Sequence, residues 1–240
     1  MTNWKKIGIF TGMGFPIVAF LLGGFLTYKS INSTQKSEEL KEEERQELAQ
    51  EYFGSDLKKV ISEQENILGI KHFGEPKLSL GFSLTADASY YPQTDLIKIN
   101  NSVLLKRFIA HELGHFYADK VSEGLGRGDW PIFKGKIVDG EYGKDDMGLK
   151  LIAEGIATYF ESRTEGDGLT GDLEHKNFSN YNSIGIGKYY NVGNNLVKPI
   201  LDKDVRKGVE LLVANPPTSA DLEDLVGYKK RMLERMEELK

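Results

Sequence analysis

The pentapeptide HELGH at residues 111–115 constrains the fold of this chain more than any other feature. It lies in residues 101–124, where apolar side chains recur with a helical period and Gly124 is placed to end a helix. Residues four apart lie on the same face of a helix, so His111 and His115 present both imidazoles to one point. The sequence therefore predicts that HELGH lies inside an amphipathic helix, with both histidines on one face.

The residue types of this pentapeptide indicate a metal site. The chain has no cysteine, so any metal must be held by His, Asp or Glu. Glu112 follows the first imidazole and can take a proton from a water molecule without binding the metal itself. We predict Zn²⁺ bound by His111 and His115, with Glu112 as the general base. An accidental pair of core or surface histidines is the alternative.

A catalytic zinc site that leaves one position for water needs a third protein ligand. The best candidate is Glu154 in IAEGIATYFE, a helical segment with 38 residues between it and His115. Gly114 has no side chain, so it would let a neighbouring segment approach the helix closely. The alternative for this glycine is a tolerated surface position.

HELGH followed by EGIATYFE resembles the gluzincin metallopeptidases, in particular the aminopeptidase-N-like pattern of HExxH followed by a helix that reads NEGFAxYxE. The matching residues of the second segment are Glu154, Gly155, Ala157, Tyr159 and Glu161. The resemblance implies that Glu154 is the third zinc ligand. It also implies a zincin-like catalytic domain with a small twisted sheet, an active-site helix and a following helix that carries this glutamate.

Two further segments extend the resemblance. YYNVGNNLV resembles the family's Y-x-x-G segment, whose tyrosine helps to stabilise an oxyanion, so that role falls on Tyr190, with Gly193 three residues later. Tyr189 is the competitor, and a packing role for both tyrosines is the alternative. The strand LIKIN, residues 96–100, resembles the edge strand along which an extended peptide binds in this family.

The chain also departs from the family pattern. It has no GxMEN-like segment, with which such aminopeptidases grip a free amino terminus, so the resemblance implies no exopeptidase specificity. Ala153 stands where the family places Asn before the third ligand. Thr158 stands where thermolysin-like members place an Asp that orients a zinc-bound histidine. Asp119 and Glu161 are the two candidates for that orienting role.

The hydrophobic periodicity of the rest of the chain predicts an α+β fold that is mainly α. Two strands are expected within residues 78–100. Further helices are expected over residues 149–163, 184–201, 204–213 and 219–240. His72 and His175 fall in expected loops, where each is interpreted as an ordinary polar residue.

Between Lys6 and Lys29 lie 22 consecutive uncharged residues, enough for a helix to cross a hydrocarbon core of about 30 Å. We therefore predict a transmembrane anchor at 1–29, a charged juxtamembrane stalk at 30–48 and a zincin-like catalytic domain at 49–240. A cleaved signal peptide is the rival for the first segment. The basic residues favour an extracytoplasmic catalytic domain only weakly, because they lie on both sides of the span.

The expected function is peptide-bond hydrolysis by a single-pass, membrane-anchored zinc peptidase, endopeptidase-like, that acts on a peptide or protein substrate. A net charge of -5 and a pI near 5.5 argue against nucleic acid as a partner. The alternative is a catalytically weak or inactive zincin-fold protein that binds or scaffolds others at the membrane. Neither cleavage specificity nor oligomeric state follows from the sequence.

Overall fold

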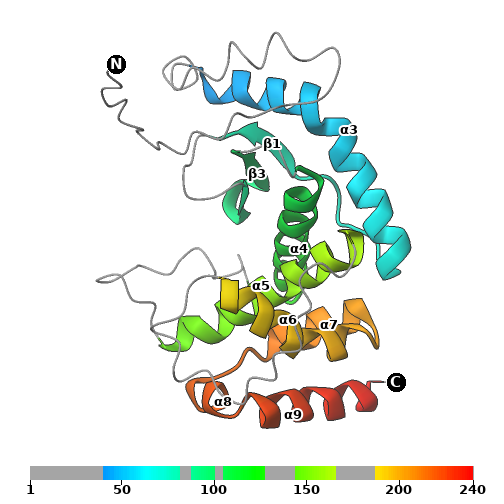
Figure 1. The fold of residues 1–240 in the computed structure, drawn as a ribbon, viewed down its shortest axis with the longest axis vertical. Coiled ribbons are helices and arrows are strands. Elements are labelled where there is room, and N and C mark those ends of the chain that lie inside the picture. Colours follow the sequence, from blue (N-terminus) through cyan, green and yellow to red (C-terminus); the bar gives the residue numbers. More distant parts are fainter. Residues whose placement is uncertain (1–39, 82–87, 101–104, 128–143, 166–186, 240) are drawn as a thin grey trace, which may run out of the picture.

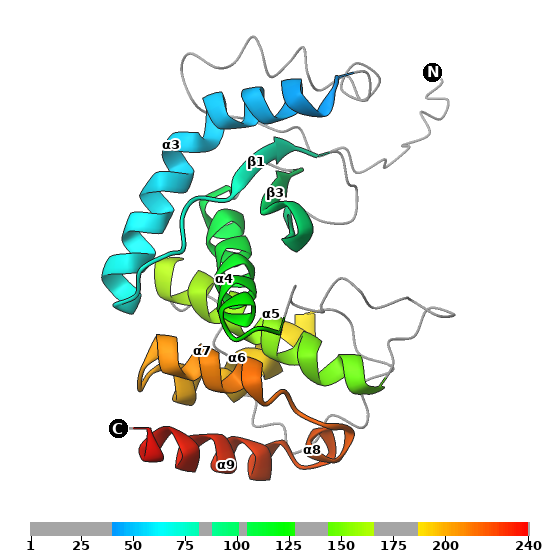
Figure 2. The same ribbon diagram turned by 180° about the vertical axis from the view of Figure 1, so that it is seen from behind.

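The computed structural model describes residues 40–81, 88–100, 105–127, 144–165 and 187–239. These residues form helices and one small sheet (Figure 1), which confirms the prediction of an α+β chain that is mainly α. The sheet and helix α3 (Glu42–Leu68) lie at one end, and helix α9 (Leu225–Glu238) lies at the other end in both views (Figure 2). Helices α4 (Leu105–Gly124) and α5 (Lys144–Glu165) lie between these ends.

Helix α3 covers the sheet with an apolar face. Side chains spaced three or four residues apart form this buried face: Ala49, Phe53, Leu57 and Val60. They belong to the same apolar cluster as the strands and the first half of α4. The helix ends at Gly69, whose φ of 64° is a left-handed conformation that glycine adopts at little cost. Since α3 begins at Glu42, the predicted end of the stalk at residue 48 falls inside a helix.

The sheet consists of β1 (Lys77–Leu80), β2 (Ala88–Tyr91) and β3 (Leu96–Ile99) in the order β1-β3-β2. Strand β1 is parallel to β3, and β2 is antiparallel to it. The chain reverses between β2 and β3 through the short 3-10 helix η1 (Pro92–Thr94) and Asp95, whose φ is 50°. The expectation of two strands therefore missed β2, which lies in a stretch rich in turn-forming residues.

The position of β3 corrects a second expectation. This strand contains most of LIKIN, which the resemblance made an edge strand, but in the described sheet it lies between β1 and β2. Its four residues pair with β1 on one side and with β2 on the other. In the described part of the sheet, β2 is the edge strand that lies against α4.

Small residues bring α5 into backbone contact with two neighbouring helices. A Cβ atom at Gly114 of α4 would lie 2.6 Å from the Cα atom of Ala157. The predicted close approach at Gly114 is thus confirmed, and its alternative as a surface position is wrong. A Cβ atom at Gly155 would lie 2.6 Å from the carbonyl carbon of Gly193 in α6 (Gly187–Leu201).

The C-terminal helices complete the core behind α5 and α6. Helices α7 (Val205–Ala214) and α8 (Ser219–Glu223) are followed by α9, and all three contribute to one buried apolar cluster with α4, α5 and α6. The side chain of Asp204 accepts a hydrogen bond from the backbone N–H of Lys207 at the start of α7. These C-terminal helices cover α5 on its side away from the sheet (Figure 1).

The expected membrane anchor is the clearest disagreement with the sequence-based predictions. Residues 1–29, which were assigned to it, lie outside the described residues. Within the described ranges, no helix combines the length and the apolar character needed to cross a membrane. Even α3, with 27 residues, carries charged side chains along its whole length. This finding contradicts the prediction of a single-pass membrane protein with an extracytoplasmic domain.

Candidate metal centre

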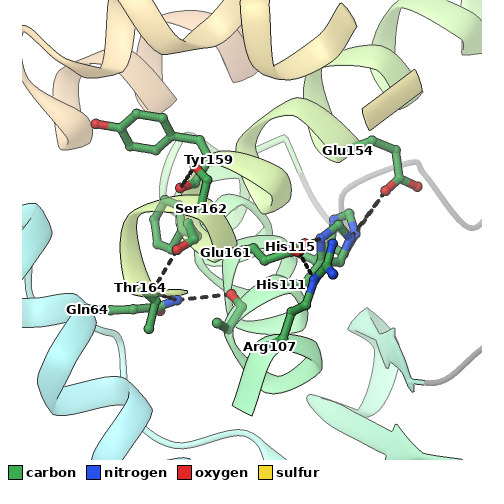
Figure 3. Close-up of polar contacts among 11 residues, drawn as sticks. Gln64, Arg107, His111, His115, Glu154, Tyr159, Glu161, Ser162 and Thr164 are labelled. Atoms are coloured by element: carbon green, nitrogen blue, oxygen red, sulfur yellow. Dashed lines mark hydrogen bonds and ion pairs between the residues drawn. The ribbon is translucent and has the colours of Figure 1, made fainter. Parts of the chain in front are cut away.

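Three predicted ligands meet where α4 and α5 pack together. The Nε2 atoms of His111 and His115 lie 3.4 Å and 3.6 Å from Oε2 of Glu154. Figure 3 shows the carboxylate of Glu154 pointing from α5 toward the two imidazoles on α4. One ligand atom from each residue lies within 4.8 Å of the other two, so this cluster could hold a metal ion.

The spacing of these atoms tests whether a zinc ion would fit. Ligands placed tetrahedrally at 2.0 to 2.2 Å from a metal lie about 3.3 to 3.6 Å from one another. The two nitrogen-to-oxygen distances fall at this spacing, at 3.4 Å and 3.6 Å. Two imidazoles with one carboxylate are also a ligand set that zinc takes in hydrolases. The residues present therefore fit zinc, although the cluster by itself does not define which metal binds.

The backbone contact between α4 and α5 explains why the ligands meet. Gly114 lies between His111 and His115 in the sequence, and it lets Ala157 of α5 approach α4. Glu154 is three residues before Ala157, about one helical turn away, so its side chain lies beside the two imidazoles. A larger residue at position 114 would separate the helices and move the carboxylate away from the histidines.

Burial and charge act in opposite directions on the ligands. Burial alone would raise the pKa of Glu154, but the imidazoles of His111 and His115 bring it well below its usual range. Burial alone would lower the pKa of His111, yet the carboxylates of Glu154 and Glu161 raise it to about 10. In the metal-free protein, the cluster therefore holds a carboxylate against a protonated imidazole.

Glu161 occupies the orienting position that the sequence left open. Its Oε2 atom lies 3.0 Å from Nδ1 of His111, on the side of the ring away from Glu154. The guanidinium of Arg107 contacts the other carboxylate oxygen. Burial would raise the pKa of Glu161, but His111 and Arg107 lower it. Asp119, the other candidate, instead accepts a hydrogen bond from Tyr90 at 2.8 Å.

Glu112 lies next to the ligands without being one of them. Its side chain is buried, and burial raises the pKa of its carboxyl group above the usual range. The backbone N–H of Tyr90 in β2 donates a hydrogen bond to this carboxylate and partly offsets that effect. A carboxylate whose pKa is raised toward neutral is suited to accept a proton and return it.

Tyr190 of α6 lies beside the metal ligands. Its ring packs edge-on against the imidazole of His111, with 5.4 Å between the ring centroids and 71° between the ring planes. Burial raises the pKa of the phenol, and the nearby carboxylates of Glu154 and Glu112 raise it further. The phenol therefore stays protonated and can donate a hydrogen bond. The side chain of Tyr189, the competing residue, lies outside the described part of the chain.

Sequence reasoning missed one polar residue behind the site. Gln64 of α3 is fully buried, and its amide nitrogen donates to the backbone carbonyl of Ala110, the residue before His111. The same nitrogen lies 3.3 Å from the hydroxyl of Thr164 in α5. The amide oxygen accepts a hydrogen bond from Nε2 of His72 at 3.0 Å. No local signal distinguishes Gln64 from the exposed polar residues that surround it in α3.

His72 itself differs from the expectation of an ordinary loop residue. It follows the end of α3 but is buried, and its ring packs edge-on against Tyr117 at 5.6 Å between centroids. Its ring nitrogen pairs with Gln64. His175, the other histidine assigned to a loop, lies outside the described residues.

The structure therefore brings together His111, His115 and Glu154 as a possible metal-binding triad. The resemblance to the gluzincins rests on the short segments around these residues. Comparisons with protein-family models, with curated proteins and with solved structures find no significant match to this chain.

Proposed function

We propose that this protein is a zinc-dependent peptidase that hydrolyses peptide bonds with Glu112 as the general base. The observation that carries the proposal is the convergence of Nε2 of His111, Nε2 of His115 and Oε2 of Glu154 beside a buried glutamate. Two imidazoles and one carboxylate leave a fourth position for water or substrate. A purely structural zinc site would instead close its coordination with a fourth protein ligand.

Zinc, when bound by these residues, would lower the pKa of water and polarise the substrate carbonyl. Glu112 then accepts a proton from the attacking water while the water oxygen bonds to the carbonyl carbon. The same carboxyl group passes this proton to the amide nitrogen as the carbon–nitrogen bond breaks. Its raised pKa favours both transfers, because a base with a pKa closer to neutral also serves as an acid.

The negative charge that develops on the carbonyl oxygen needs a hydrogen-bond donor to stabilise it. Tyr190 supplies a protonated phenol whose ring packs against His111. A hydrogen bond of this kind stabilises the transition state more than the bound substrate, because the charge exists only after attack begins. Glu161 and Arg107 hold the His111 ring from the opposite side, so the imidazole keeps one orientation during the reaction.

The proposed substrate is an extended peptide or protein segment that lies along β2. This strand is the edge of the described sheet, and its residue Tyr90 directs its backbone N–H toward the general base. An edge strand offers backbone groups that can pair with an extended chain independently of its sequence. A peptide bound in this way would pass beside Glu112 with its main chain parallel to the sheet.

The test compares the zinc-loaded full chain with the Glu112→Gln variant on fluorescently labelled casein. We expect one zinc per chain in both proteins, by elemental analysis, and a loss of hydrolysis of about a thousandfold in the variant. Glu123→Gln is the matched control, because Glu123 is on the same helix but pairs with Lys120 at its exposed end. A chain that binds no zinc, or a Glu112→Gln variant that still hydrolyses casein, contradicts the proposal.

A further inference from the structure

One face of α4 contacts the edge strand rather than the metal ligands. Glu112, Phe116 and Asp119 are four and then three residues apart, so their side chains lie along one side of the helix. All three contact Tyr90 of β2. Its backbone N–H donates to Glu112, its ring packs edge-on against Phe116 at 5.8 Å between centroids, and its hydroxyl donates to Asp119.

The hydroxyl end of Tyr90 is held in a polar network that is buried on the side of Asp119. Its Oη atom lies 2.8 Å from Oδ2 of Asp119 and 3.0 Å from Oδ1 of Asp95. Lys120 forms an ion pair with Asp95 at 2.7 Å. Tyr90 is 1% exposed and Asp119 is 0% exposed. A hydrogen bond from a neutral donor to a buried carboxylate is stronger than one between neutral groups, so this contact is expensive to lose.

The two polar contacts of Tyr90 are far apart along α4. Glu112 and Asp119 are separated by seven residues, which is about 10 Å along the helix axis. One tyrosine is therefore attached to α4 at two points, through its main chain at one and its side chain at the other. Two attachments fix both the distance of β2 from the helix and the register of the strand along it, whereas one would leave rotation possible.

We infer that the buried hydrogen bond between Tyr90 and Asp119 positions β2 against α4 and thereby holds the Glu112 carboxylate in place for proton transfer. This inference rests on the proposed function, because it assigns Tyr90 and Asp119 as positioning residues for the same reaction. Neither residue is one of the three that form the metal cluster. Loss of their contact should therefore change the rate of the chemical step while zinc stays bound.

The geometry explains why the effect should be on rate. The main-chain N–H of Tyr90 is retained in any variant of that residue, but its position depends on how firmly the strand is held. Displacement of a catalytic group by about 1 Å can lower the rate about a hundredfold. Substrate affinity depends on many backbone contacts along the strand, so KM should change less than kcat.

The experiment measures kcat and KM for casein hydrolysis by the zinc-loaded full chain and its Tyr90→Phe variant. We expect kcat to fall about tenfold or more, with KM and zinc content within about twofold of the parent. Tyr159→Phe is the matched control. Tyr159 is equally buried and its hydroxyl also donates to a carboxylate, that of Asp202 at 2.9 Å. In Figure 3 its hydroxyl points away from the histidines.

A second pair of variants keeps the test decisive if Tyr90→Phe folds poorly. Asp119→Asn retains an oxygen that can accept the tyrosine hydrogen bond, whereas Asp119→Ala does not. We expect Asp119→Asn to keep kcat within about threefold and Asp119→Ala to lose about as much as Tyr90→Phe. The double variant Tyr90→Phe/Asp119→Ala should be about as slow as the slower single variant, because both changes remove the same hydrogen bond between Tyr90 and Asp119.

The outcomes separate the two proposals. If the parent protein hydrolyses casein and Glu112→Gln does not, but Tyr90→Phe and Tyr159→Phe have equal kcat, the positioning role is overturned and the peptidase assignment stands. The positioning role is also overturned if kcat, zinc content and thermal stability all fall together in Tyr90→Phe, since that pattern indicates that the variant folds poorly. A zinc-loaded parent without hydrolytic activity overturns both.

Discussion

Nδ1 of His111 lies 3.0 Å from Oε2 of Glu161, so the imidazole that faces Glu154 is held from behind by a second carboxylate. The pair joins α4 to α5 and fixes which ring nitrogen points toward the metal cluster. Arg107 balances the charge of Glu161 without reaching the ligands itself. Metal affinity should therefore depend on a residue that never contacts the metal.

Glu161→Ala should weaken zinc binding by about ten- to a hundredfold, because the imidazole of His111 loses the partner that orients it. Competition with a fluorescent chelator measures the dissociation constant. Glu165→Ala is the control, since Glu165 lies one turn further along α5 and pairs only with Lys106 in the described contacts. Equal zinc affinity in the two variants would show that Glu161 does not orient the His111 ligand.

Zinc affinity should increase with pH across the neutral range. Burial alone would lower the pKa of His111, but Glu154 and Glu161 raise it to about 10, so the metal-free protein carries a proton on this ring at pH 7. Zinc must displace that proton, and affinity should rise about tenfold per pH unit for one proton released, up to pH about 10. Chelator competition at several pH values measures the slope, and a flat profile would refute the proton displacement.

Stability should decrease on acidification because of His72. Burial lowers its pKa to about 4, below the usual 6.5 of a histidine in an unfolded chain. Between these values the unfolded chain binds a proton that the folded chain does not, so the free energy of unfolding falls as pH falls from about 6.5 to 4. The loss is on the order of 3 kcal/mol.

Denaturant unfolding of the parent and of His72→Gln across this pH range tests the assignment. Glutamine keeps a polar side chain near Gln64 but does not titrate, so the variant should lose most of the pH dependence in that window. Parallel curves for the two proteins, offset by a constant, would mean that another group is responsible.

Gly193→Ala should destabilise the protein by about 1 to 3 kcal/mol. The added Cβ would lie 2.4 Å from the carbonyl oxygen of Leu151 and 2.8 Å from the backbone of Gly155, where nothing flexible can move away. Gly124→Ala is the control, because a Cβ there meets no atom within 4 Å. Thermal unfolding measures both variants. A Gly193→Ala protein as stable as Gly124→Ala would show that α5 and α6 can separate without cost.

The candidate site was predictable where its geometry is local. Two histidines four residues apart on one helix must share a face, whatever the rest of the chain does. Glu154 was the candidate on the next predicted helix, and the resemblance in a short segment supported it. Its position depends on the packing of Gly114 against Ala157, which the sequence could only suggest. The tertiary contacts of Gln64 and Tyr90 were not predictable, because each partner lies on an element whose placement no local pattern specifies.

The sheet shows the same limit. The LIKIN segment was recognisable as a strand from its alternating apolar residues, but strand order is a property of pairing between distant segments. Its central position in the described sheet therefore differed from the expectation of an edge strand. The ASYY segment, which does lie at the edge, was hidden among turn-forming residues.

The hydrogen bond between Gln64 and Thr164 joins residues 100 positions apart in the chain. Gln64 lies in α3, and Thr164 lies in the last turn of α5, the helix that carries Glu154. The contact can therefore form only after distant parts of the chain have met. Contacts of such high sequence separation form slowly, because closing the long loop between them costs conformational entropy before the contact can stabilise the chain. Zinc added during refolding should therefore bind in a late kinetic phase, and the rate of metal uptake would report the last step of folding.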